Sequence, residues 1–490
     1  MNLNFNVSFN ELYTVSGIHK INTLFNQTTS NSESLTALAV KLEEFIINLF
    51  GIGEHYVKIQ KKIENALILN KCKQQFVKKN KYIEIDDTEF EQVKKEIEQT
   101  LQSNQITDIK LAKNIIHWMS NTDKYKSQLL LAQQYISYSI KHKKHPVLTK
   151  LPIKLNYSIP FQKNGQQGIL HAHKNNDLLC SGNKIKIRDR FNYTNKDPST
   201  EEAISESKYC LICHIRKKDS CSTGYYKKSQ LQQSEVGTPL TGCPLQQKIS
   251  EAHELLNQGH LVAAFILIMI DNPMCAATGQ HICNECKISC IFQKQTPVDI
   301  PQVESYILQC ILSLNYGFEI YSLLSKWNPL RISQPLPKEY NGQNILISGM
   351  GPAGFTLAYY LSNAGCNIVG IDGIKIEPLT YDLVGQYDKK LDQKLGFQPI
   401  KHIHDHFSDL QKRIIYGFGG VMEYGITSRW NKNLLLVIRL LLERRNNFLL
   451  KSGITLNNYN YTQIKNLGFH HVALTSGAGN PRYIDLETIH

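Results

Sequence analysis

The stretch QNILISGMGPAGFTLAYYLSNAGCNIVGIDG, from Gln343 to Gly373, decides the fold class of the C-terminal part of the chain. An apolar segment, Asn344 to Ser348, runs into a glycine-rich turn and then into apolar residues at helical spacing. A second apolar segment ends at Asp372. The order of strand, glycine-rich turn, helix and strand predicts a Rossmann-like βαβ unit.

The turn itself has the GxGxxG pattern of dinucleotide-binding sites. Its first glycine allows a tight turn, its second lets the backbone approach a pyrophosphate, and its third allows the helix to pack close to the strand. Phosphates are expected at the helix N-terminus, and an acidic residue after the second strand is expected to accept hydrogen bonds from a ribose hydroxyl. The alternative is a βαβ unit without a ligand. The expected cofactor-binding positions here are Gly349, Gly351, Pro352, Ala353, Gly354 and Asp372.

A second feature is the crowding of cysteines, because eight of the twelve lie between Cys210 and Cys290. Thiolates a few residues apart can converge on one metal centre. This density suits two iron–sulfur clusters, while structural zinc and ordinary buried thiols are the alternatives. The spacing is Cys210-x2-Cys213-x7-Cys221, then Cys243 in Gly-Cys-Pro, then Cys283-x2-Cys286-x3-Cys290, with Cys275 outside the pattern.

The composition is that of a globular protein of roughly three or four domains, with 490 residues, 42% hydrophobic and 20% charged. The formal net charge is +13, but the basic residues are dispersed, so we expect no nucleic-acid partner. The apolar run Leu261 to Ile270 is too short to span a bilayer and predicts a buried helix. The N-terminus lacks a targeting pattern, so we expect a reducing, cytoplasmic location in which clustered cysteines bind metal.

The fold class expected is multidomain, α plus α/β. Helical spacing recurs at Leu35 to Phe50 and Phe90 to Leu101, and Pro244 to Ile270 is expected to be helical. Three prolines between Asn328 and Gln343 mark a domain boundary. The regions expected are a helical region of unknown role at 1–150, an irregular linker region at 151–208, a mostly helical cysteine region at 209–330 and the Rossmann-like region at 343–490.

Three histidines, His402, His404 and His406, follow an alternating pattern. On a strand they would share one face and could bind a metal. Surface histidines on a loop are the interpretation we favour.

The cysteine region resembles a known family. The segments TGCPLQQKISEAHELLNQGHLVAAFILIMIDNP, GQHICNECKISC and PVDIPQVESYI are similar to the N-terminal iron–sulfur domain of the glutamate synthase small subunit and of dihydropyrimidine dehydrogenase. The resemblance covers about residues 205–310, although the segment between Cys221 and Cys243 is longer than in compact family members. It implies two 4Fe-4S clusters with interleaved ligands. One would be held by Cys210, Cys213, Cys221 and Cys290, and the other by Cys243, Cys283, Cys286 and Glu304.

Glu304 stands where the family often has a ligand other than cysteine. The alternative for this residue is an interaction with the macrodipole at a helix N-terminus.

The same resemblance favours FAD over NAD at the glycine-rich turn. GFGGVMEYGI, Gly417 to Ile426, resembles the segment beside the flavin, and VALTSGAGNPR, Val472 to Arg482, resembles the strand that ends in an ATGA-like turn. Thr427 replaces the family's proline, and Thr475-Ser476 replaces its Ala-Thr. These segments add Gly420, Gly425, Ser476 and Gly477 to the expected cofactor-binding positions.

The function that the resemblance implies is an electron-transfer oxidoreductase, or a fragment of one, that depends on NAD(P)H. Electrons would pass from NAD(P)H through FAD to the 4Fe-4S clusters and to an unknown acceptor. No catalytic acid or base is expected. The family's NAD(P)H-binding half would follow the ATGA-like turn, where this sequence ends, so we expect a second polypeptide to supply it. A cluster-binding module or split-gene remnant without enzyme activity, and a zinc-stabilised interaction protein, are the alternatives.

Overall fold

The computed structural model describes most of the chain. The residues described are 15–24, 32–142, 148, 170–172, 178–180, 197–234, 237–279, 282–388, 390, 393–410, 416–424 and 431–477.

The C-terminal part is built on a parallel sheet of four strands. These are β5 (Asn344–Ser348), β6 (Asn367–Asp372), β9 (Phe448–Ser452) and β10 (His471–Leu474), in the spatial order β10-β5-β6-β9. Every neighbouring pair is parallel. This is the strand order of half a Rossmann fold, in which the direction of strand addition reverses between β5 and β10. The expected βαβ unit is therefore present, and α17 (Pro352–Asn363) is its helix.

Helices cover both faces of this sheet. Ile345 and Ile347 of β5 are buried in the main core, to which α17 and α20 (Leu434–Glu443) contribute. Leu346 points to the other face, where it packs with Ile371 and with Ile464 of α21 (Asn458–Asn466). A central strand that is buried on both sides requires a continuous apolar run, as β5 has.

The cysteine region is mostly helical and joins the same core. It contains α9 (Thr200–Tyr209), α11 (Ile249–Asn257), α12 (Leu261–Asp271), α15 (Ile300–Ser313) and α16 (Gly317–Lys326). Helix α12 is buried from Leu261 to Met269, as its sequence predicts. The stretch from Pro244 to Ile270 is helical from Ile249 onward, as two helices, because Gly259 has a φ of +93° and separates α11 from α12. Residues 200–209 are also helical rather than irregular, since Ser199 and Glu202 form a capping box.

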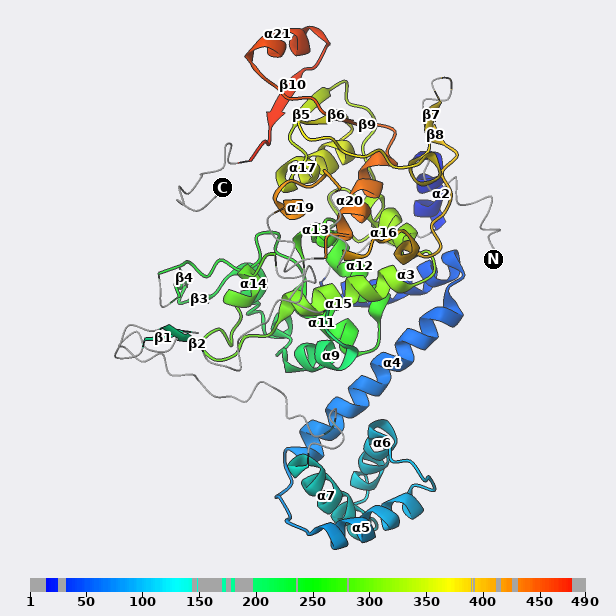
Figure 1. The fold of residues 1–490 in the computed structure, drawn as a ribbon, viewed down its shortest axis with the longest axis vertical. Helices are drawn as coiled ribbons and strands as arrows, with labels where there is room; N and C mark the ends of the chain where they lie inside the picture. The colour runs from blue at the N-terminus through cyan, green and yellow to red at the C-terminus, as the bar shows by residue number, and fades with distance from the viewer. Residues whose placement is uncertain are drawn as a thin grey trace, which may run out of the picture.

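The N-terminal helices contribute to two cores. Those of the main body are α2 (Val15–Leu24), α3 (Ser32–Phe50) and the first part of α4 (Gly53–Cys72), whose buried residues join the main core. Beyond the π-helical turn η1 (Lys73–Val77), α5 (Asp87–Thr100), α6 (Asp108–Met119) and α7 (Lys126–Lys141) enclose a core of their own. Figure 1 shows this lobe at the far end of α4, away from the sheet.

Short elements complete the described residues. They are β1 (Leu170–Ala172), β2 (Leu178–Cys180), η3 (Cys213–Arg216), α10 (Ser220–Thr223), β3 (Tyr226–Lys227), β4 (Gln230–Leu231), α13 (Cys275–Thr278), α14 (Glu285–Ile288), α18 (Tyr381–Val384), β7 (Gln386–Asp388), β8 (Gln393–Leu395), η4 (Ile403–His406) and α19 (Val421–Tyr424).

Within these residues, no single helix is both long and apolar enough to cross a membrane. The pair α15 and α16 reaches that length only together, with a bend of 115° between the two helices.

Candidate functional site

The glycine-rich turn folds tightly against the turn that follows β10. Gly349 has a φ of +101°, and a Cβ atom there would lie 2.6 Å from the carbonyl oxygen of Thr475. A Cβ atom on Gly354 would lie 1.9 Å from the carbonyl oxygen of Gly349. Both positions therefore require glycine, for the reasons that the GxGxxG pattern predicts.

Gly351 has a different environment, because a Cβ atom there would meet nothing closer than the Cα atom of Gly420, at 3.8 Å. It is the N-cap residue of α17, and Pro352 is the first residue of that helix. The N-terminus of α17 has backbone N–H groups without a partner inside the helix, and no side chain covers the adjacent Gly351. Both features suit the binding of a pyrophosphate.

The later segments meet this turn at the same edge of the sheet. The Cα atom of Ser476 lies 2.9 Å from the position of a Cβ atom on Gly349, and Gly477 follows directly. The Thr475 hydroxyl donates to the carbonyl oxygens of Ser348 and Gly349, at 3.0 and 2.7 Å. The sequence analysis did not select Thr475 as a functional residue. The signal that could have identified it is that Thr475 stands where the family has alanine. The structure thus gathers the turn, Gly420, Ser476 and Gly477, whereas Gly425 lies outside the described residues.

Asp372, the expected partner of a ribose hydroxyl, contacts the backbone of the glycine-rich turn. Its Oδ2 atom accepts a hydrogen bond from the backbone N–H of Met350 at 2.8 Å, and its Oδ1 atom accepts one from Ile374 at 3.0 Å. The carboxylate therefore holds the turn as well as standing at the end of β6. Because each carboxylate oxygen has a second lone pair, this pairing leaves capacity for a ribose hydroxyl.

The second ligand group comprises Cys243, Cys283, Cys286 and Glu304, which all line one cavity of about 240 Å³. Burial raises the pKa of the Cys243 thiol, and the nearby Glu304 carboxylate and Cys283 raise it further. Burial also raises the pKa of Cys286 well above its usual value, with added contributions from Glu304, Cys243 and Cys283. The four side chains that the resemblance assigns to one cluster are therefore electrostatic neighbours.

Glu304 projects from α15 into this cavity. A Cβ atom on Gly279 would lie 2.7 Å from its Oε1 atom, so the α13 end packs directly against the carboxyl group. Burial raises the pKa of Glu304 to about 7, although side-chain hydrogen bonds from Gln247 and Asn272 lower it. The macrodipole interpretation is not supported, because the first turn of α15, Ile300 to Val303, ends before Glu304.

The first thiol group comprises Cys210, Cys213, Cys221 and Cys290. The pKa of Cys210 is raised to about 12, chiefly by burial and also by the neighbouring Cys213 and Cys290. Burial raises the pKa of Cys221 as well, followed by the Asp219 carboxylate, Cys210 and Cys290. Cys290 is thus close to three cysteines that precede it by about seventy residues or more in the sequence.

Backbone contacts hold the two groups side by side. The N–H of Cys243 donates to the carbonyl oxygen of Cys221 at 2.8 Å, which joins a residue of one group to a residue of the other. Gly242 has a φ of +79°, and its N–H donates to the Ser289 hydroxyl at 2.9 Å. A Cβ atom on Gly242 would lie 2.5 Å from the backbone nitrogen of Gly224. The Gly-Cys-Pro element therefore needs its glycine to fit between the two ligand-bearing loops.

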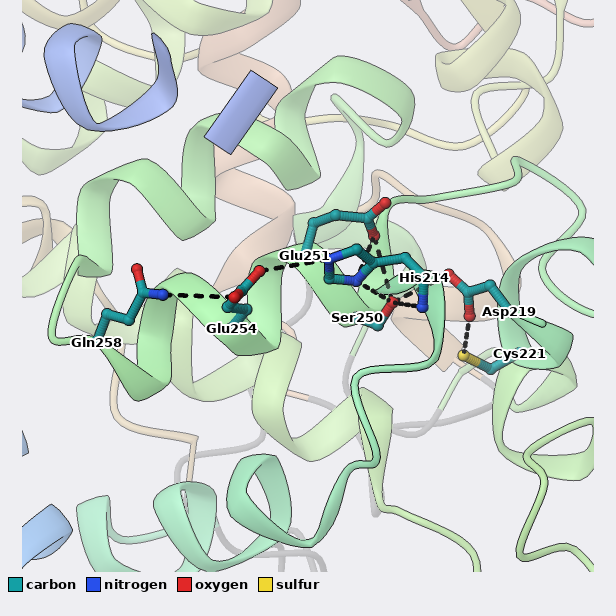
Figure 2. A network of polar contacts seen from close by, with 7 residues as sticks. All are labelled: His214, Asp219, Cys221, Ser250, Glu251, Glu254 and Gln258. Atoms are coloured by element: carbon teal, nitrogen blue, oxygen red, sulfur yellow. Dashed lines mark hydrogen bonds and ion pairs between the residues drawn. The ribbon is translucent and has the colours of Figure 1, made fainter. Parts of the chain in front are cut away.

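A chain of polar contacts links Cys221 to helix α11, as Figure 2 shows. The Cys221 thiol donates to Oδ1 of Asp219 at 3.0 Å, and the Ser250 hydroxyl donates to Oδ2 at 3.1 Å. His214 lies 2.8 Å from Ser250 through Nδ1 and 3.3 Å from Oε2 of Glu254 through Nε2. Sequence reasoning missed these residues, because no spacing rule connects them. They fix the loop that carries Cys213 and Cys221.

A single metal ion and an iron–sulfur cluster differ in the spacing that they require of their ligands. Among the described residues, no three or more His, Cys, Asp or Glu side chains gather closely enough to hold one ion. Tetrahedral zinc with bonds of about 2.3 Å needs thiolates roughly 3.8 Å apart. A 4Fe-4S cluster is larger, since its ligands surround four irons and four sulfides.

The other cysteines and the histidine motif have different surroundings. Cys275 is 1% exposed and lies 3.5 Å from the Tyr321 hydroxyl, on the core side of α13. The cysteines whose side chains the structure describes are free thiols. His402, His404 and His406 are all exposed, as the favoured interpretation of surface histidines expects, and the alternative of a strand is wrong, because η4 is a 3-10 helix.

The dinucleotide turn and the second ligand group share helix α17. Its N-terminus begins at the glycine-rich turn, while Thr356 and Tyr360, farther along, line the 240 Å³ cavity. A cofactor bound at the turn and a cluster bound in the cavity would therefore contact the same helix.

No family model matches the chain. It is similar to two proteins of Rickettsia prowazekii (strain Madrid E), each described as uncharacterized. Uncharacterized protein RP006 is 49% identical over 215 residues, which are 44% of this chain and 29% of that protein. Uncharacterized protein RP005 is 27% identical over 294 residues, which are 53% of this chain and 99% of that protein. The chain thus spans less than a third of the first relative and nearly all of the second.

Proposed function

We propose that the chain is an electron-transfer flavoprotein component of the glutamate synthase small-subunit type. In this proposal FAD binds at the glycine-rich turn, and two 4Fe-4S clusters bind at the first thiol group and the second ligand group. The family itself is part of the proposal, because it rests on sequence motifs.

The grouping of the ligands carries the proposal. Cys290 comes last among the cysteines of the motif yet neighbours Cys210 and Cys221, whereas Cys243, which precedes it, neighbours Cys283 and Glu304. This interleaving is the one that the resemblance implies, and it gives four ligands in each group. Seven thiols and one carboxylate form two groups of four, which is the number of ligands that two cubane clusters need.

The chain's own residues supply binding, spacing and insulation. The glycines of the turn let the helix N-terminus of α17 approach a pyrophosphate. The cysteines must lose their protons to serve as ligands, and their raised pKa values mean that iron has to displace those protons. Bound FAD would exchange two electrons with NAD(P)H and one at a time with the clusters. Helix α17 would keep the two cofactors close enough for such an exchange.

The proposal includes a partner. NAD(P)H would bind to a second polypeptide or to a segment equivalent to the part of the 49% identical relative that this chain does not span. The N-terminal lobe of α5, α6 and α7, which has its own core, offers a docking surface for that partner or for an acceptor subunit. Free thiols and oxygen-sensitive clusters fit a reducing, cytoplasmic location.

Two alternatives remain distinct from this proposal. A cluster-binding module without flavin would keep both ligand groups but not use the glycine-rich turn. A zinc-stabilised interaction protein would use some of the same cysteines, although none of the described residues form a close set of ligands for a single ion.

Metal and flavin analysis of the full chain, purified without oxygen, tests the proposal. We expect roughly eight irons and eight acid-labile sulfides per chain, a broad absorbance band near ~400 nm and releasable FAD. Cys221→Ser and Cys243→Ser should each lower the iron content by about half, because each removes a ligand from a different cluster. Cys72→Ser is the control, since Cys72 is an equally buried thiol in the N-terminal lobe.

Protein without iron or sulfide would refute the proposal. Iron without flavin would support the cluster-binding module instead. Zinc in place of iron would support the interaction protein.

A further inference from the structure

A second cavity, of about 760 Å³, lies next to the cavity of the second ligand group. Leu245 and Tyr360 line both cavities, so their side chains form part of the wall between them. The larger cavity has the volume of a site for a small organic molecule.

Three parts of the chain meet around this cavity. Leu35 comes from α3, Tyr360 comes from α17, and Arg331 comes from the segment that follows α16. Lys248 and Asp271 come from the cysteine region. Cavities at such junctions are frequent binding sites, because several elements can each contribute a contact.

The polar groups of the cavity leave an excess of positive charge. Lys248 pairs with Asp271, with its Nζ atom 2.9 Å from Oδ2 and 3.1 Å from Oδ1. Arg331 donates instead to main-chain oxygens, through Nε to Ile270 at 3.2 Å and through Nη2 to Met269 at 2.8 Å. The lining thus contains two cations and one carboxylate, and that carboxylate, Asp271, pairs with Lys248 and also interacts electrostatically with Arg331.

The remaining walls are apolar and partly aromatic. Pro273, Leu330 and Ile332 line the cavity, and the ring of Tyr360, which is 43% exposed, is available for stacking. Aromatic molecules pack well against such surfaces, and the guanidinium group of Arg331 would attract an anionic substituent on the molecule.

We propose that this cavity binds an aromatic anion, a planar apolar molecule with one acidic group. Its role rests on the proposed function: next to the second cluster, the molecule would be the electron acceptor. A quinone of this class would be reduced to a hydroquinone by two electrons, which a cluster held by the second ligand group would supply. Two protons from water would complete the hydroquinone.

Binding of 1,4-naphthoquinone-2-sulfonate to the full chain, measured by calorimetry, tests the proposal. Ile332 is suited to substitution, because its side chain lines the cavity but is 74% exposed. Ile332→Glu adds a repulsive charge and should weaken binding by at least about fivefold, whereas Ile332→Lys should preserve or strengthen it. Leu467→Glu is the matched control, with the same 74% exposure at a site that does not line the cavity, and should leave binding unchanged.

Two further measurements separate charge from shape. Neutral 1,4-naphthoquinone should bind at least about fivefold more weakly than the sulfonate and should respond little to either charge at position 332. Ser333→Trp places a large side chain at the exposed rim of the cavity and should reduce the binding of both compounds.

Absence of binding by the wild-type chain would overturn the proposal. So would binding that Ile332→Glu and Ser333→Trp leave unchanged, since the compound would then bind elsewhere. These measurements need neither iron nor flavin, so a chain that lacks clusters but binds the sulfonate at this site would refute the proposed function and the acceptor role while retaining the binding site.

Discussion

At the scale of single residues, the glycines of the turn differ in whether the fold itself requires them. Gly354 has no space for a methyl group, because a Cβ atom would overlap the carbonyl oxygen of Gly349. Gly351 does have space within the protein, since the nearest atom to its Cβ position lies at 3.8 Å. In the proposed function, its missing side chain leaves room for the pyrophosphate of FAD.

The Gly351→Ala variant should fold normally but lose FAD. Its Cβ atom makes only ordinary contacts within the chain but would occupy the surface that a pyrophosphate approaches. We expect releasable FAD to fall at least tenfold, with a change in melting temperature of less than about 2 °C. Gly53→Ala is the control, because its Cβ atom would also find an open space, 4.0 Å from the nearest atom. Full flavin content in the Gly351→Ala protein would contradict a cofactor at this turn.

The sequence was informative about residues whose identity is imposed by spacing or by backbone geometry. The glycines of the turn could be selected for that reason, whereas the eight expected ligand positions, Glu304 among them, were assigned through the family resemblance. Asp219 and Ser250 could not, because their positions next to the thiols depend on how the loop before Cys221 packs on α11. The role of Asp372 in holding the turn was likewise invisible, since its contact with Met350 arises only after β6 pairs with β5.

At the scale of elements, periodicity located the long helices and the βαβ unit. Helix α3 covers the expected Leu35 to Phe50, and α5 corresponds to the expected Phe90 to Leu101. The errors occurred where a local signal competes with apolar spacing. Gly259 ends a helix that hydrophobicity alone would extend, and the capping box at Ser199 begins one in a segment that resembles a turn.

One buried carboxylate adds a polar link between helix α3 and the cysteine region, beside the apolar core that they share. Glu43 is 4% exposed and accepts hydrogen bonds from the Tyr56 hydroxyl at 2.9 Å and from the backbone N–H of Ala263 at 2.8 Å. Its other oxygen lies 2.8 Å from Nδ1 of His260, the N-cap residue of α12. A carboxylate at a helix N-terminus is favoured by both the free N–H groups and the helix dipole.

The Glu43→Leu variant should therefore be destabilised by about 2–4 kcal/mol. Leucine conserves most of the volume but leaves two buried polar groups, the Tyr56 hydroxyl and the Ala263 N–H, and the half-buried His260 ring without their acceptor. Urea denaturation monitored by circular dichroism would give the difference, and Glu44→Leu is the control because Glu44 is exposed on the same helix. We expect less than about 0.5 kcal/mol for the control. Equal effects of the two substitutions would show that the buried network does not stabilise the junction.

At the scale of the whole molecule, the main core joins the sheet, the ligand-bearing helices and the first N-terminal helices. Residues from α3, α12 and α17 all belong to it. The glycine-rich turn and the cavity of the second ligand group are therefore held at a fixed separation. The lobe of α5, α6 and α7 has a separate core and is joined by α4. Sequence periodicity identifies the helices of both parts, but it contains no information on which core each helix enters.

The source of electrons provides the last prediction. The described sheet has one glycine-rich turn at one topological switch point, which the proposed function assigns to FAD. In the proposed function, the hydride donor binds to a second polypeptide or to a segment equivalent to the part of the 49% identical relative that this chain does not span. We expect dithionite to bleach both the flavin and the iron–sulfur absorbance of the anaerobic chain, whereas NADPH or NADH alone should bleach neither at a rate above about one hundredth of that seen with dithionite. Rapid bleaching by either nucleotide would place a functional NAD(P)H site in this chain and remove the need for a partner.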